Sequence, residues 1–221
     1  MWKFIRENRP FFVPYFFVLI IVGFLQLVYD KTQLFLFINT HANVGADFFF
    51  RYLTNVGDGL FYAVIIIVLL FVQYRYALAA VLSFALTSLA AQLLKHLVFS
   101  SSLRPKGFYE HSEVTLRVIE GVKVYTNNSF PSGHATTAFS VACLLSLLIK
   151  QKKWGYFFFF LACFTSYSRV YLEQHFVEDV YFGSILGVLL TLLLTNWLFR
   201  YLENNPKPWH EGKLKFRTRS K

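Results

Sequence analysis

The chain has 221 residues, of which 56% are hydrophobic, 20% aromatic and only 15% charged, and its formal net charge is +10. Because soluble domains carry about 25% charged residues, this composition argues against a soluble globular protein and indicates an integral membrane protein. The two cysteines, Cys143 and Cys163, fall inside apolar runs, which favours packing roles over a disulfide or a metal site.

Six apolar runs are long enough to cross a bilayer, which takes about 17–25 residues each. They cover residues 11–29, 58–76, 78–99, 133–149, 154–172 and 180–199. Backbone hydrogen bonds must close within each segment in lipid, and these runs lack the alternation of barrel strands, so we predict helices. The expected fold class is an all-α integral membrane protein: one domain over residues 1–221, with six transmembrane helices in one bundle.

The segments around these runs are short. The first run is expected to remain as an uncleaved span, because VYDKTQ follows it where a signal peptide would have small residues. Residues 32–57 mix Phe and Leu with polar residues and are predicted to form a short interfacial helix and a turn after the first span. Residues 201–221 form a basic tail that is expected to face solvent or lipid headgroups, not nucleic acid.

The distribution of lysine and arginine predicts the orientation. With six spans, both termini and the loops near residues 75 and 150–153 share one side, which holds fourteen of the 22 basic residues. The positive-inside rule places that side in the cytoplasm. The other side then faces the exterior, as for a bacterial inner-membrane protein with an extracytoplasmic site.

Three polar clusters should meet on this outer face. The third run ends with Lys95 and SSSLRP, the fourth begins with PSGH, and the fifth ends with SRVYLEQHFVED. Ionisable groups near spans are costly and often mark function. Lys95, Arg104 and Arg169 could each be a snorkelling or interface side chain, but three cations at one point favour an anion such as phosphate.

Two further features of the sequence accompany these cations: a helix start at residues 132–134 and a histidine–aspartate pair. Ser132 is a candidate N-cap for the fourth helix, whose free N–H groups favour an oxyanion, and Gly133 lets a phosphate approach the backbone closely. A helix start alone does not account for His134 in the first turn. His175 and Asp179 are four residues apart, so on a helix they share a face, and the carboxylate can fix the ring tautomer.

These clusters resemble the three signature motifs of the type 2 phosphatidic acid phosphatase (PAP2) superfamily, the lipid phosphate phosphatases. Residues 131–134 match the second motif, and Ser168-Arg169, His175 and Asp179 match the third. The first motif departs, since eight residues separate Lys95 from Arg104-Pro105 where the family usually has six. Lys106 is therefore an alternative to Lys95, although the SSS turn could absorb the extra residues. The resemblance covers essentially the whole chain.

The resemblance implies a metal-independent hydrolase that needs no cofactor and works through a phosphohistidine. His175 would attack phosphorus while Asp179 orients it, and His134 would protonate the leaving alkoxide and then deprotonate water. The phosphate-binding groups would be Lys95, Arg104, Ser132, Gly133 and Arg169.

The implied substrate is a lipid phosphate or diphosphate at headgroup level. Phosphatidic acid, phosphatidylglycerol phosphate, a polyprenyl diphosphate and a lipid A phosphate all fit, and the stretch from Lys106 to Phe130 is expected to cap the site and choose among them. A lipid phosphotransferase could use the same His-His-Asp set. Vanadate-dependent haloperoxidases share the anion cradle but are soluble, so six spans argue against them. The expected partners are the lipid substrate and membrane lipids, without nucleic acid, and the oligomeric state stays open.

Overall fold

The structure is a computed structural model that describes residues 1–117, 119 and 121–215. Within these residues the secondary structure is helical, and the only β-type pairing is an isolated bridge between Leu103 and Asn127. The predicted all-α class is therefore confirmed.

Six long helices occupy the six predicted runs. They are α2 (Arg9–Val28), α5 (Gly59–Val72), α6 (Tyr74–Leu93), α8 (Gly133–Leu148), α9 (Trp154–Tyr171) and α10 (Val177–Asn204). The break between the second and third runs lies at Gln73, not after residue 76 as predicted, because Gln73 has an extended backbone and caps the end of α5 with its N–H on Leu69. At its other end α6 continues as a π-helical turn, η2 (Leu94–Val98).

Not all six helices have the length of a membrane span. Among the described residues, Arg9–Val28, Tyr74–Val98 and Val177–Asn204 are long and apolar enough, and the pair Val44–Gly57 and Gly59–Val72, bent by 56°, makes a fourth candidate. The 16 residues of α8 extend about 24 Å, less than the hydrocarbon core of about 30 Å. The long apolar helices are those of an integral membrane protein, while the count of six spans stays a prediction.

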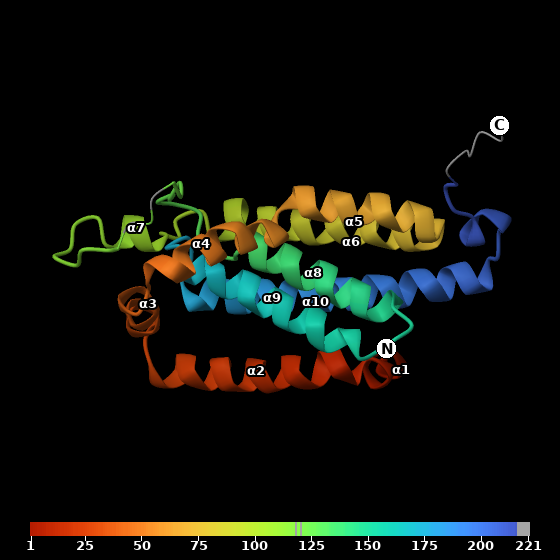
Figure 1. Cartoon of the computed structure of the whole chain (residues 1–221), viewed down its shortest axis with the longest axis horizontal. Coiled ribbons are helices and arrows are strands. Elements are labelled where there is room, and N and C mark those ends of the chain that lie inside the picture. Colours follow the sequence, from red (N-terminus) through yellow and green to blue (C-terminus); the bar gives the residue numbers. More distant parts are fainter. Residues whose placement is uncertain (118, 120, 216–221) are drawn as a thin grey trace.

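Helix α8 is the centre of the bundle. It contacts α5, α6, α9 and α10, and twelve of its 16 residues are buried. In Figure 1, α2 runs along one edge of the molecule, where it packs on α9, and the α5–α6 pair runs along the opposite edge. A helix surrounded in this way meets protein on most sides, which explains how a short helix can sit in the middle of a membrane protein.

Two glycines bring α10 unusually close to α8. A Cβ atom on Gly187 would lie 2.3 Å from the carbonyl oxygen of Thr136, and one on Gly183 would lie 2.7 Å from that of Ser132. Small residues four positions apart allow helix backbones to approach in membranes. Gly183 and Gly187 follow Asp179 by four and eight residues, so the contact holds the first turn of α8 against the part of α10 just beyond Asp179.

The segment before α5 contains two helices where the sequence predicted one. They are α3 (Lys31–Thr40) and α4 (Val44–Leu53), followed by a 3₁₀ turn, η1 (Thr54–Gly57). Asp30 caps α3 and Asn43 caps α4 by accepting backbone N–H bonds, so Asn43 begins a second helix within the predicted stretch. Figure 1 shows α3 nearly end-on, across the direction of the bundle. Its location at the membrane interface stays a prediction.

The two ends of the bundle differ in content. The short N-terminal helix α1 (Trp2–Glu7) and the C-terminal 3₁₀ turn η3 (Pro208–Glu211) lie at one end in Figure 1. The short helix α7 (Pro105–Phe108), the start of α8 and the turn between α9 and α10 lie at the other end. All three polar clusters therefore meet at the end away from the termini, as the sequence predicted.

Candidate active site

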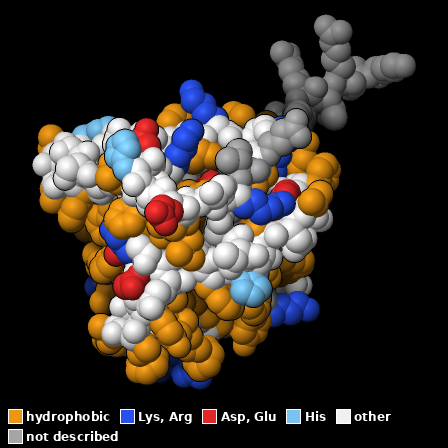
Figure 2. Space-filling view, turned by 90° about the vertical axis from the view of Figure 1, so that its left-hand side faces the viewer, with side chains coloured by type: hydrophobic (Ala, Val, Ile, Leu, Met, Phe, Trp, Pro, Cys, Tyr) orange, Lys and Arg blue, Asp and Glu red, His pale blue; other side chains and the backbone are white. Residues whose placement is uncertain are grey.

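The end of the bundle that carries the three clusters is polar. Figure 2 looks onto this end and shows lysine, arginine, acidic and histidine side chains among uncharged polar groups, with hydrophobic side chains around them. Beneath this surface, the structure brings the eight predicted site residues to one region.

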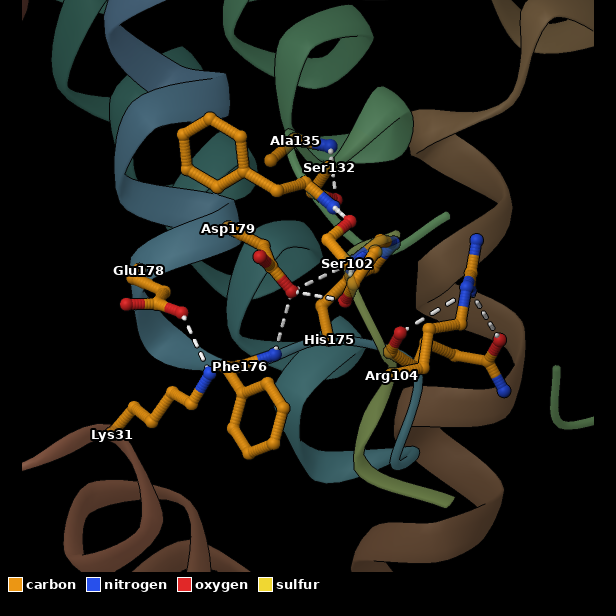
Figure 3. Close-up of polar contacts among 12 residues, drawn as sticks. Lys31, Ser102, Arg104, Ser132, Ala135, His175, Phe176, Glu178 and Asp179 are labelled. Atoms are coloured by element: carbon orange, nitrogen blue, oxygen red, sulfur yellow. Dashed lines mark hydrogen bonds and ion pairs between the residues drawn. The ribbon is translucent and has the colours of Figure 1, made fainter. Parts of the chain in front are cut away.

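A histidine–carboxylate pair forms the deepest part of the site (Figure 3). His175 Nδ1 lies 3.2 Å from Asp179 Oδ2, and each residue is only 1% exposed. The prediction that both residues share a helix face is wrong, because α10 begins at Val177 and His175 lies in the turn before it. The contact forms because the turn folds His175 back over the first turn of α10.

The carboxylate of Asp179 is held by further donors. Its Oδ2 accepts the backbone N–H of Phe176 at 2.9 Å and the hydroxyl of Ser129. The backbone N–H of Ser132 donates to the carbonyl of Asp179 at 3.0 Å, which joins the second motif to the third. The sequence did not point to Ser129, because a serine outside the motif carries no signal of a long-range contact.

The environment of His175 keeps its ring neutral. Burial holds the pKa of His175 well below its ordinary value, and the positive charges of Arg104, Arg169 and Lys95 act in the same direction. With Nδ1 bonded to the carboxylate, the lone pair on Nε2 is available as a nucleophile or base at neutral pH.

Two arginines flank this pair and donate mainly to uncharged oxygens. Arg169 is 8% exposed, and its Nη1 donates to Thr54 Oγ1 at 2.7 Å. Its Nε is buried and has no hydrogen-bond partner within the described residues. Arg104 donates through Nε to the carbonyl of Asn127 at 2.9 Å, and through Nη1 to the backbone and side-chain oxygens of Gln174 at 3.2 Å each (Figure 3).

The lysine of the first motif can now be placed. Lys95 lies in η2, is partly buried, and interacts electrostatically with Asp179 and with the two arginines. Lys106 in α7 is exposed, and its charge acts on Glu173 instead. Of these two lysines, Lys95 is therefore the one whose charge acts on Asp179.

No carboxylate forms an ion pair with Lys95, Arg104 or Arg169 in the part of the chain that the structure describes. Charges that are removed from water need a counter-charge. Nor do three or more His, Cys, Asp or Glu side chains come together to hold a metal ion within residues 1–117, 119 and 121–215. The cation cluster is suited to an anionic ligand.

The start of α8 faces the same region. Ser132 is the N-cap, as predicted, and its side chain accepts the N–H of Ala135 at 3.4 Å (Figure 3). A Cβ atom on Gly133 would meet no heavy atom within 4 Å, so the backbone there borders open space. An oxyanion can therefore come close to the backbone at Gly133, in the first turn of the helix.

His134 has a partner that the sequence did not reveal. Its Nε2 lies 2.9 Å from Oδ1 of Asp58, at the junction between η1 and α5. The two side chains are 29% and 46% exposed, respectively. From the sequence, Asp58 is only the first residue of a predicted span, because nothing in its neighbourhood indicates a contact 76 residues away.

A cleft of about 420 Å³ opens on this part of the site. Its lining includes Asp58, His134 and Arg169 on one side, and Lys123 and Tyr125 from the predicted capping stretch on the other. His175 is not part of this lining and lies deeper.

Hydrogen bonds tie the capping stretch to the rest of the molecule, among them those of Arg117 and Gln174. The guanidinium of Arg117 donates to both carboxylate oxygens of Asp47 in α4, at 2.7 and 2.5 Å. Gln174 donates from Nε2 to the carbonyl of Lys123 at 3.1 Å. The stretch therefore forms a fixed wall of the cleft in the described residues.

Known proteins resemble this chain in sequence and in fold. A family model described as the PAP2 superfamily matches residues 76–203, a range that contains all three clusters. The lipid A 4'-phosphatase of Bacteroides thetaiotaomicron is 30% identical over 179 residues, which cover 77% of this chain and 76% of the relative. The undecaprenyl-diphosphatase BcrC of Bacillus subtilis is 26% identical over 119 residues, 54% of this chain and 55% of that protein.

Solved structures agree at the level of the fold. The crystal structure of Aquifex aeolicus LpxE matches with a TM-score of 0.65 at 24% identity, over 75% of this chain and 94% of that one. The relatives are phosphatases of membrane lipids by name, and the family match extends over more than half of the sequence. The chain therefore belongs to the PAP2 superfamily.

Proposed function

We propose that this protein is a membrane-embedded phosphatase that hydrolyses a phosphate or diphosphate of a lipid at the extracytoplasmic face. The observation that carries the proposal is the group of three cations without carboxylate partners beside the buried His175–Asp179 pair. A phosphate supplies the missing negative charge, and its transfer is accelerated by groups that stabilise charge on the equatorial oxygens. The names of the relatives, a lipid A 4'-phosphatase and an undecaprenyl-diphosphatase, support the same substrate class.

The proposed reaction has two steps. Nε2 of His175 attacks phosphorus, the P–O bond to the lipid breaks, and His134 gives its proton to the departing oxygen. A water molecule then loses a proton to His134 and attacks the phosphohistidine, so that the P–N bond breaks and phosphate leaves. Lys95, Arg104, Arg169 and the N–H of Gly133 hold the phosphate oxygens in both steps, while Ser132, whose own N–H is bonded to Asp179, holds the start of α8 in place.

Phosphate release tests the function. The purified protein in vesicles is offered lipid A, undecaprenyl diphosphate, phosphatidic acid and phosphatidylglycerol phosphate, each with and without excess EDTA. We expect release from at least one of them, unchanged by EDTA and inhibited by vanadate, because side chains and helix N–H groups already neutralise the phosphate.

Two results would contradict this assignment. Loss of activity on chelation that magnesium restores would reject the metal-independent mechanism. Transfer of labelled phosphate to a second lipid, without matching free phosphate, would make the protein a lipid phosphotransferase.

The orientation follows from the position of the basic residues and has its own test. Ser112 and Lys207 are exposed and lie near opposite ends of the bundle. In a background without Cys143 and Cys163, we expect Ser112→Cys to react with a membrane-impermeant thiol reagent in intact cells. Lys207→Cys, the matched control, should react only after permeabilisation. The reverse pattern would invert the proposed topology.

A further inference from the structure

The turn η1 and the residue after it contact two of the proposed site residues at once. Thr54 accepts the hydrogen bond from Arg169 Nη1, and Asp58 lies 2.9 Å from His134 Nε2. Between them, Gly57 packs directly on the first turn of α8, since a Cβ there would lie 2.9 Å from both the Cβ and the carbonyl oxygen of His134. A segment of five residues, TNVGD, therefore fixes side chains from two motifs.

The two histidines of the site are held in complementary ways. Asp179 contacts Nδ1 of His175 and leaves its Nε2 for the substrate, whereas Asp58 contacts Nε2 of His134 and leaves its Nδ1. A carboxylate accepts from a ring N–H, so it fixes which nitrogen keeps a proton and which one exchanges it. The His175 pair is buried while the His134 pair borders the cleft, where a leaving group and water can reach it.

We propose that Asp58 is a positioning residue for His134, which holds the ring so that Nδ1 delivers a proton to the departing lipid oxygen. The inference rests on the proposed function, in which His134 is the general acid. As the phosphorus–oxygen bond breaks and the bond to His175 Nε2 forms, the proton on Nδ1 of His134 moves to the departing oxygen. The proton on Nε2 of His134 stays on the ring, hydrogen-bonded to Asp58. In the second step the proton from water returns to Nδ1. Asp58 itself neither gains nor loses a proton.

Leaving-group dependence separates this role from a structural one. An alkoxide needs a proton as it departs, whereas a nitrophenoxide leaves without one. We compare dodecyl phosphate with 4-dodecyl-2-nitrophenyl phosphate, which share the chain length, and measure kcat/KM because it reports the steps up to cleavage of the ester. For Asp58→Asn we expect kcat/KM to fall by about 10–100-fold with the alkyl ester, because part of the contribution of the general acid is lost. With the aryl ester, kcat/KM should change by less than about threefold.

Three controls make the outcome decisive. His134→Ala should show the same preference for the aryl ester with a larger loss, Asp58→Glu should recover part of the alkyl activity, and Asp30→Asn, which changes an exposed N-cap of α3, should behave as wild type. If Asp58→Asn lost kcat/KM equally with both esters, or with neither, the role of Asp58 would be overturned. The role of His134 as the general acid would still stand if His134→Ala lost activity with the alkyl ester only. Equal losses in His134→Ala would overturn the role of His134 as the general acid, and with it that of Asp58, while phosphate release from the lipids remains the test of the phosphatase function.

Discussion

Replacement of His175 by alanine is expected to abolish turnover, with a loss of at least about 10⁴-fold in kcat, as for removal of a catalytic nucleophile. In the wild type, a labelled phosphoryl group should remain on the protein after rapid quenching, acid-labile and base-stable as a phosphoramidate is. The physical reason is the environment of the ring. Burial keeps the pKa of His175 low, so the imidazole is neutral, and Asp179 directs Nε2 toward the substrate.

Peptide mapping of the quenched protein checks this expectation. The label should be found on His175, and His175→Ala should lose it together with activity. Asp179→Asn serves as the graded comparison: it disturbs the tautomer but keeps the nucleophile, so some activity should survive. A label on another residue, or none when hydrolysis of the intermediate limits the rate, would reject His175 as the nucleophile.

The second large effect is expected at the first motif. Lys95→Ala should cost about 2–4 kcal/mol of transition-state stabilisation, the cost of losing one oxyanion donor, or about 30- to 900-fold in kcat/KM. Lys95 is partly buried and interacts with Asp179, Arg104 and Arg169, whereas Lys106 is exposed and acts on Glu173. Lys106→Ala is therefore the matched control and should stay within about 0.5 kcal/mol of wild type, as surface substitutions usually do.

Steady-state kinetics with the lipid that releases phosphate measures both variants, and circular dichroism confirms that each one is folded. A larger loss in Lys106→Ala than in Lys95→Ala would transfer the role to Lys106. It would also mean that α7 moves toward the His175–Asp179 pair when substrate binds.

The sequence predicted the helices and the motif residues well because both depend on local patterns. Long apolar runs identify helices by composition, and Ser132 in PSGH indicates a helix start because serine is a favoured N-cap residue. Contacts between distant segments have no such signature. Asp58 beside His134 and Thr54 beside Arg169 depend on how η1 folds onto α8 and α9, and the sequence around them is that of an ordinary span entrance.

Errors in the prediction also have a local physical origin. The stretch after the first span contains Asn43, whose side chain caps a new helix by accepting the N–H of Ala46, so two helices form in place of one. His175 lies outside α10 because Phe176 has an extended backbone, and the helix begins after it. In both cases a single residue at a helix end decides the structure, and helix ends are the least regular part of the pattern.

The π-helical turn at the end of α6 has a consequence for how such chains diverge. The N–H of Phe99 bonds to the carbonyl of Leu94, so the turn winds one more residue than an α-helical turn while the helix before it keeps its face. An insertion in an α-helix would otherwise rotate all that follows by about 100°. A bend over Phe99–Ser102 then leads to Arg104, whose backbone N–H donates to the carbonyl of Thr126. The π turn and this bend together accommodate the eight residues between Lys95 and Arg104.

The second and third motifs are held too closely to accommodate an extra residue. The N–H of Ser132 bonds to Asp179, and Gly183 and Gly187 bring α10 against α8 so closely that one extra residue in either first turn would break the register. These contacts fix the spacing within PSGH and from Arg169 to His175 and Asp179, whereas the spacing from Lys95 to Arg104 is set by a turn and a bend.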